Sequence, residues 1–138
     1  MIQPAGNRFL MAIVAIALAA CSGDKSKTDM DPNIFPANYK NEILETMTKT
    51  LADPTNVRDA FITDPMLAHA VRDQRYIVCI RYNARNANRH YMGSTDRIGY
   101  FYGGRLNQLV DATKEQCGNA PYKKFPELEQ LCLAKKCE

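Results

Sequence analysis

The sequence predicts an α+β fold with an N-terminal helix, a three- to four-stranded antiparallel sheet, a short C-terminal helix and a disulfide brace. Three observations support this prediction. Helical periodicity is confined to the two ends of the region 38–138, and the segments between them alternate with a period of two. Two adjacent glycines join a pair of these segments, as in a tight hairpin. We expect one antiparallel sheet that is covered on one face.

The first element is an amphipathic helix over 38–52, because apolar residues recur at every fourth position while charged residues fill the other side. Asp53-Pro54 ends it, since the residue before a proline disfavours the helical conformation. The residues of the apolar stripe are Tyr39, Ile43, Met47 and Leu51.

The central part of the chain predicts strands. A short strand is expected over 57–63, between two prolines, and one or two helical turns over 66–71. The alternation is strongest over 75–84. One face of this strand carries Tyr76, Val78, Ile80 and Tyr82, and the other carries Ile77, Cys79, Arg81 and Asn83.

Gly103-Gly104 predicts a two-residue hairpin turn, which requires positive φ angles. The turn would place Tyr102 opposite Arg105, Phe101 opposite Leu106 and Tyr100 opposite Asn107. One hairpin face would then hold Gly99, Phe101, Leu106 and Val110, and the other Ile98, Tyr100, Tyr102, Arg105 and Leu109. No pattern follows Asp111 until a short helix over 126–135.

The N-terminus has the features of a secretory signal: Arg8, an apolar run over 9–20, and Leu18-Ala19-Ala20-Cys21 at its end. The run is too short to span a bilayer, which takes about 20 apolar residues. Leu18-Ala19-Ala20-Cys21 resembles the lipobox of bacterial lipoproteins. The resemblance implies a signal peptide over 1–20, cleavage before Cys21 and a membrane anchor through lipid on Cys21. An ordinary secreted protein is the alternative.

By the same resemblance, Ser22 after the cysteine implies export to the outer membrane, with the domain facing the periplasm. Residues 21–37 are rich in Ser, Gly, Asp, Lys and Thr and predict a flexible, lipid-anchored tether. Residues 38–138 suffice for a single periplasmic domain. The mature part also resembles uncharacterised small envelope lipoproteins, in which a strand with a cysteine runs into an Asn-Ala-Arg-Asn stretch, here Cys79 and 83–86.

Four cysteines remain in this domain: Cys79, Cys117, Cys132 and Cys137. An even number in an exported chain predicts two disulfides. Three pairings are open. We favour Cys117 with Cys132 or Cys137, because irregular, proline-containing chain separates them. A zinc site is the weaker alternative, since the cysteines lack paired ligand spacing.

Seven of the arginines and five of the tyrosines lie within 72–105, a window without lysine that carries about +5. Arginine binds carboxylates and phosphates through a planar fork, and Arg with Tyr is typical of interfaces. The polar stretch 83–96 predicts a binding loop. The partner-binding candidates are therefore Arg81, Arg85, Arg89, His90, Tyr91, Arg97, Tyr100 and Arg105. The alternative is that these residues are ordinary solvated strand residues.

No catalytic, metal-binding or cofactor motif is present in the sequence, and no basic run indicates nucleic acid. His69 lies in a short apolar stretch and is expected to be structural. We expect a non-enzymatic binding or assembly module for peptidoglycan, lipid phosphates or an acidic envelope protein. The alternatives are an inhibitor of a lysozyme-type muralytic enzyme, which would use the loop 83–96, and an enzyme centred on His90, Asp96 or Asp111.

Overall fold

The computed structural model describes residues 33–69 and 74–131, so Cys21, Cys132 and Cys137 lie outside the described residues. The fold is a mixture of helices and one antiparallel sheet, as predicted. The helices are α1 (Tyr39–Thr50), α2 (Lys114–Cys117) and α3 (Pro126–Glu129). The strands are β1 (Asp53–Ile62), β2 (Met66–His69), β3 (Gln74–Arg85), β4 (Thr95–Tyr102), β5 (Arg105–Asp111) and β6 (Lys123–Lys124).

The sheet has the strand order β5-β4-β3-β1-β6, and β2 also pairs with β3. All pairings between the named strands are antiparallel. The described residues thus form six strands rather than the predicted three or four. The two short strands, β2 and β6, depend on a longer strand for their pairing, and their sequences are too short to show a period of two.

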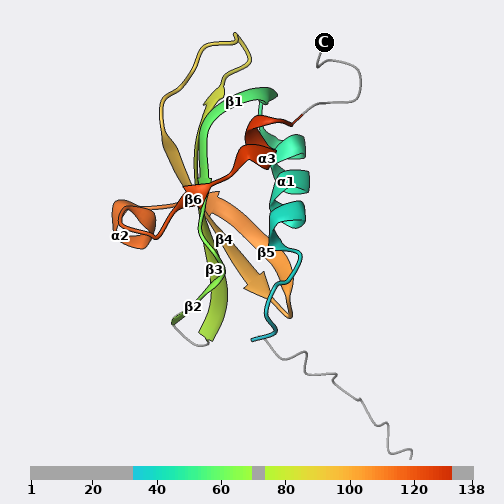
Figure 1. Ribbon diagram of the computed structural model, residues 1–138, viewed down its shortest axis with the longest axis vertical. Coiled ribbons are helices and arrows are strands. Elements are labelled where there is room, and N and C mark those ends of the chain that lie inside the picture. Colours follow the sequence, from blue (N-terminus) through green and yellow to red (C-terminus); the bar gives the residue numbers. More distant parts are fainter. Residues whose placement is uncertain (1–32, 70–73, 132–138) are drawn as a thin grey trace, which may run out of the picture.

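Helices lie on both sides of this sheet: α1 and α3 on one side and α2 on the other (Figure 1). Ile43 and Met47 of α1 and Leu128 of α3 are fully buried in the main core, so the predicted helical stripe is a core face. A second cluster around Ile98 packs on the opposite face. The expectation of a sheet covered on one face was wrong, because alternate residues of β3 are apolar on both sides.

A disulfide joins Cys79 of β3 to Cys117 of α2, and both residues are fully buried in the second cluster. The preference for Cys117 with Cys132 or Cys137 was therefore wrong. The reason is topological. After α2 the chain returns to the main core, where Phe125 and Leu128 are buried, while Cys117 stays on the opposite face beside β3.

Residues Met66–His69 form a strand and not helical turns, so that prediction was wrong. They pair with β3 from Met66 opposite Ile77 to His69 opposite Gln74. An isolated helical turn is costly to nucleate, whereas β3 supplies a ready partner for pairing. Tertiary pairing therefore decides the conformation of this segment.

The hairpin turn at Gly103-Gly104 is present, and both glycines have positive φ, 57° and 77°. Tyr102 lies opposite Arg105 and Phe101 opposite Leu106, as predicted, but Tyr100 lies opposite Gln108 instead of Asn107. A register shift between Tyr100 and Phe101 is the cause. It exchanges the predicted faces of Leu109 and Val110. Leu109 therefore packs against the main core, and Val110 is 40% exposed.

Strand β1 is irregular at two points, between Asp53 and Arg58 and between Arg58 and Phe61. Asn56 and Asp59, within these two stretches, have φ angles of 56° and 51°. Asn and Asp tolerate this left-handed region better than other non-glycine residues. The first irregularity bends the start of β1 away from regular pairing and shapes the cleft described below.

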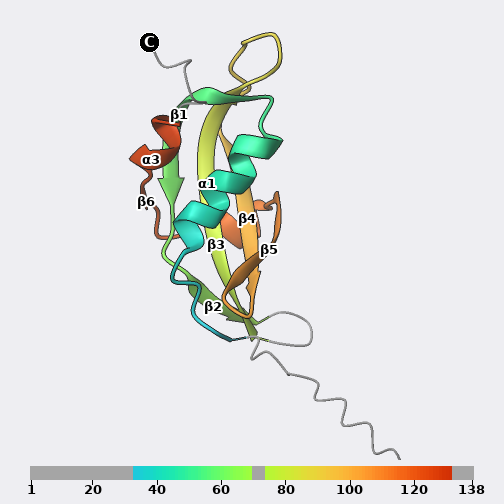
Figure 2. The ribbon, with the colours of Figure 1, turned by 90° about the vertical axis from the view of Figure 1, so that its right-hand side faces the viewer.

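The chain already packs against the domain before Asn38, the residue at which the domain is predicted to begin. Pro36 is fully buried, and the Phe35 ring makes an edge-on contact with Tyr76 at 5.4 Å between centroids. The chain therefore joins the domain at the end of the sheet formed by β2 and the β4–β5 turn (Figure 2). At the other end of the chain, α3 occupies only Pro126–Glu129 of the predicted 126–135, and the last residues of that range lie outside the described residues.

Candidate functional site

The predicted arginines lie on both faces of the sheet. Arg81 points to the face that carries α2, where its guanidinium stacks 4.4 Å from the centroid of the Tyr122 ring. It forms a two-pronged ion pair with Asp96, with Nε–Oδ1 at 2.6 Å and Nη2–Oδ2 at 2.8 Å. Arg97 is the cross-strand partner of Ile80 and therefore points to the opposite face.

Most of these arginines are neutralised within the chain. Arg97 donates to the backbone oxygen of Leu109 at 2.6 Å and lies 3.5 Å from an Asp111 carboxylate oxygen. Arg105 pairs with Glu42 of α1, with Nε–Oε1 at 2.6 Å. Each of these ion pairs joins a well-exposed side chain to a more buried one, with Asp111 90% and Arg105 80% exposed, and each supplies the arginine with a carboxylate from the chain itself.

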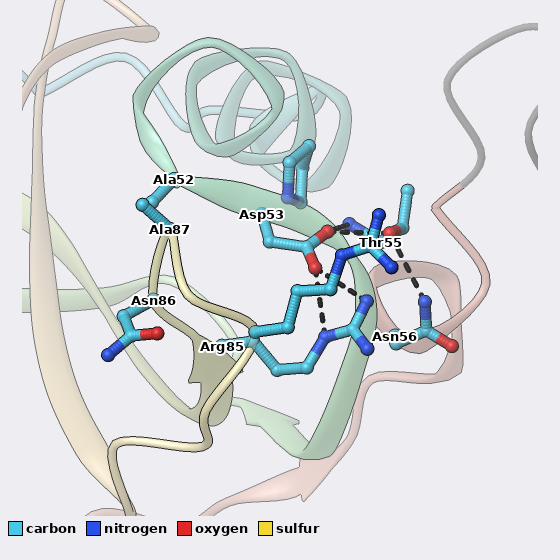
Figure 3. A pocket seen from close by; sticks show the side chains of 9 residues that line it. Ala52, Asp53, Thr55, Asn56, Arg85, Asn86 and Ala87 are labelled. Atoms are coloured by element: carbon cyan, nitrogen blue, oxygen red, sulfur yellow. Dashed lines mark hydrogen bonds and ion pairs between the residues drawn. The ribbon is translucent and has the colours of Figure 1, made fainter.

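The structure brings Arg85 and Arg89 together in one cleft of about 450 Å³ at the end of the sheet (Figure 3). One wall is the turn from α1 into β1, and the other is the loop that follows β3. The cleft is polar. Its lining consists of Ala52, Asp53, Pro54, Thr55, Asn56, Arg85, Asn86, Ala87 and Arg89.

Asp53 holds the two walls together. Its Oδ1 accepts hydrogen bonds from the Thr55 amide and hydroxyl at 3.0 and 2.6 Å, and its Oδ2 accepts from Arg85 at 2.8 Å (Figure 3). The Thr55 hydroxyl, and after it Arg85, lowers the pKa of Asp53, although partial burial opposes them. The carboxylate therefore stays ionised, and it neutralises Arg85.

The loop after β3 is held in a fixed shape. The Asn86 side-chain oxygen accepts from the amides of Asn88 and His90 at 2.9 and 3.0 Å. The Tyr91 hydroxyl donates to the Asn56 carbonyl at 2.8 Å, and Arg58 stacks 4.2 Å from the Tyr91 ring centroid. These contacts tie the loop to β1, so the cleft is preformed.

Arg89 is the exception among the predicted arginines. Its backbone, at a φ of 65°, is part of the loop's turn. Within residues 33–69 and 74–131 its side chain has no hydrogen bond or ion pair, and it is exposed at the cleft. The lining thus carries two cations and one anion, which leaves a charge of about +1 at a polar cleft.

A second cleft, of about 420 Å³, lies on the α2 face and is more apolar. The predicted candidate Tyr100 lines it and accepts a hydrogen bond from Gln116 at 3.1 Å. His69 also lines it and is exposed at the end of β2, with Nδ1 3.5 Å from the Gln74 side-chain nitrogen. The full lining is Ala68, His69, Arg75, Ile77, Ile98, Tyr100 and Gln116.

The three residues of the enzyme alternative do not converge. His90 is exposed on the loop, Asp96 pairs with Arg81, and Asp111 is on β5 with its side chain 90% exposed. None of them lines either of the two clefts. In the part of the chain that the structure describes, no three His, Cys, Asp or Glu residues are grouped to hold a metal ion.

Sequence reasoning missed Asp53, Thr55 and Asn56 as members of the site. Asp53-Pro54 was used only as the end of a helix. An Asp whose side chain accepts from the amide two residues later is a known turn former, so the Asp-Pro-Thr sequence carried a usable signal. The role of Asn56 depends on its contact with Tyr91 and has no local signal.

No family model matches this chain, and no curated protein or solved structure is significantly similar to it. Among the described residues, none of the helices has the length and apolar character needed to cross a membrane.

Proposed function

We propose that this protein is an outer-membrane lipoprotein, anchored through Cys21, that binds an anionic envelope component without catalysing a reaction. The observation that most supports the binding of an anionic component is the preformed polar cleft, in which the Arg89 side chain is unpaired among the described residues. An exposed guanidinium beside amide groups suits a carboxylate or a phosphate. Asn56 and Asn86 supply those amides.

The position of the cleft favours peptidoglycan as the partner. The cleft is lined by the start of β1 and the loop after β3. These segments lie at the end of the sheet opposite the point where the chain joins the domain (Figure 2). The 12 residues of β3 connect the two ends, a span of about 40 Å at about 3.3 Å per residue. A domain anchored through Cys21 would point the cleft away from its own bilayer, toward the cell wall, whose peptides carry free carboxylates.

Cosedimentation with purified peptidoglycan tests this proposal. Arg89→Glu should weaken binding about tenfold, equivalent to about 1.4 kcal/mol, because it replaces the unpaired cation by an anion. Lys124→Glu is the matched control, since Lys124 is exposed on β6 outside the cleft and the charge change is the same. Binding of the parent should also weaken as salt is raised above physiological strength, where screening acts within about 8 Å.

Equal binding by the parent and by Arg89→Glu would contradict the proposal. Arg81 and Arg85 are unsuitable for this test, because both hold carboxylates of the fold and their reversal would destabilise the domain. Circular dichroism of the Arg89→Glu variant should match that of the parent, since the Arg89 side chain has no hydrogen bond or ion pair within the described residues.

An inhibitor of a muralytic enzyme is the second candidate. The fixed loop after β3 favours it, because a prearranged loop inserts into a catalytic cleft at low entropic cost. A slowing of lysozyme by excess protein, relieved by Arg89→Glu, would support this role. Lysozyme activity that is unaffected by excess protein would contradict it.

A further inference from the structure

The end of the sheet where the chain joins the domain exposes a group of large apolar side chains. In the described residues, four of the six exposed large apolar side chains are here, with exposed fractions of 47% for Ile34, 54% for Phe35, 48% for Leu67 and 39% for Tyr102. These four residues are called the apolar end. Scattered apolar residues are normal on a surface, but a gathered group marks an interaction site.

Contacts within the fold hold the apolar end in place. The Phe35 ring packs edge-on against Tyr76, and Leu67 is the cross-strand partner of Tyr76. Ile34 lies against the hairpin turn, with its Cγ2 only 3.0 Å from where a Cβ at Gly104 would be. The three apolar side chains are therefore brought together from the N-terminal segment and β2, beside the β4–β5 turn.

An unneutralised cation lies beside the apolar end. The Arg75 guanidinium is 5.5 Å from the centroid of the Tyr102 ring. Its Nε is buried and has no hydrogen-bond partner, and within the described residues Arg75 has no ion pair. Aromatic and aliphatic side chains with a nearby arginine are the combination found at the headgroup level of membranes.

The path of the chain indicates what covers the apolar end. The described chain begins at Asn33, next to Ile34 of the apolar end and only 12 residues after Cys21. Twelve residues span at most about 40 Å when fully extended, so a lipid on Cys21 keeps this end close to the bilayer. We propose that the apolar end lies on the lipid surface, with Ile34, Phe35, Leu67 and Tyr102 in the headgroup region and Arg75 on a lipid phosphate. This inference rests on the proposed anchoring through Cys21.

The chain contains no tryptophan, which allows a single-tryptophan experiment. Two full-length lipidated variants, Phe35→Trp and Met92→Trp, are reconstituted in vesicles of phosphatidylethanolamine and phosphatidylglycerol with brominated acyl chains. Met92 is the matched control, because it is 69% exposed and lies in the loop after β3, where its amide donates to the Ala84 carbonyl. This loop is at the opposite end of the sheet (Figure 1). The indole at position 35 should be quenched about twofold or more, since interfacial side chains reach about 5–10 Å into the bilayer boundary. The indole at position 92 should keep its emission.

The outcomes separate this inference from the anchoring on which it rests. Flotation of both variants with the vesicles, without quenching at position 35, would overturn the inference and leave the anchor intact. Failure of both to float would overturn the anchor. A blue shift at position 35 without lipid, together with a doubled mass in sedimentation, would identify a second copy as the occupant and also overturn the inference.

Arg75→Gln tests the phosphate contact. Combined with Phe35→Trp, it should reduce the quenching, because the arginine no longer holds this end on the headgroups. Lys124→Gln in the same background removes one exposed charge elsewhere and should leave the quenching unchanged. Undiminished quenching with Arg75→Gln would show that Arg75 does not hold this end on a lipid phosphate.

Discussion

At the scale of single residues, the arginines of 72–105 differ in what surrounds them. Arg81, Arg85, Arg97 and Arg105 have carboxylate partners in the chain, while the Arg75 and Arg89 side chains have none within 33–69 and 74–131. Composition cannot distinguish these two classes, because it does not show which carboxylate the fold brings to which arginine.

The Arg81–Asp96 ion pair should stabilise the domain more than the Arg105–Glu42 pair. The Arg81 and Asp96 side chains are 32% and 17% exposed, whereas the Arg105 side chain is 80% exposed. We expect Arg81→Ala to reduce the free energy of unfolding by about 2 kcal/mol, and Arg105→Ala by less than about 1 kcal/mol. Urea denaturation measures both values. An equal loss in the free energy of unfolding for the two variants would contradict the expectation that the Arg81–Asp96 pair stabilises more.

Asp53 should contribute to the loss of stability in acid. Its pKa is lowered in the folded protein, first by the Thr55 hydroxyl and then by Arg85. Its contribution is therefore fully present above the unfolded-state pKa of about 4 and is lost as the pH falls through the lower folded-state pKa. Thr55→Val should raise the pKa of Asp53 in an NMR titration. It should also make the free energy of unfolding fall less steeply as the pH is lowered. An unchanged pKa would show that Thr55 is not the main cause.

At the scale of the elements, the disulfide fastens α2 to the centre of the sheet. The sequence separation of Cys79 and Cys117 is 38, for which the chain-entropy model gives a stabilisation of about 4 kcal/mol. A Cys79→Ala, Cys117→Ala variant should lose most of this in urea denaturation. Tryptic mapping without reduction should link the peptides 76–81 and 115–123. A different linkage would contradict the assignment.

The bulge in β1 depends on a residue that tolerates a positive φ. Asp59 has a φ of 51°, where a β-branched side chain meets its own backbone. Asp59→Val should cost about 1–2 kcal/mol in thermal or urea unfolding. Asp59→Gly should be close to neutral, because glycine adopts this conformation freely. If valine were as well tolerated as glycine, the backbone at this position would not have the assigned conformation.

At the scale of the whole molecule, the two ends of the sheet differ in chemistry. The end near Asn33 exposes apolar side chains, and the end beyond β3 carries the polar cleft with Arg89. A lipid anchor at Cys21 would give each end its own environment, a bilayer on one side and the cell wall on the other.

The anchor itself is tested by Cys21→Ser. In the producing cell, the parent should incorporate labelled fatty acid and fractionate with the outer membrane, because two or more acyl chains bind a bilayer stably. The variant should lose the label and leave the outer-membrane fraction. Mass spectrometry of the mature parent should find a diacylglyceryl group on an N-terminal Cys21. An unmodified N-terminus at another position would exclude the anchor.

Local patterns in the sequence determined much of this protein. The helical period gave α1, the alternation gave β3, and the glycine pair gave the β4–β5 turn, because each signal lies within one segment. The same reasoning singled out Arg85 and Arg89, two of the residues that line the polar cleft. It missed the capping box of Thr113 and Gln116 at α2, although the spacing is readable in the sequence.

Only the tertiary structure decided the rest. The Cys79–Cys117 link and the carboxylates that pair with Arg85 and Arg105 join residues far apart in the chain. The pairing of β2 and the register shift in β5 lie within short hairpins, and no period in those segments indicated them. Such contacts depend on which surfaces meet when the sheet assembles. A local period fixes which side of an element is apolar, and it carries no information about the element that will cover that side.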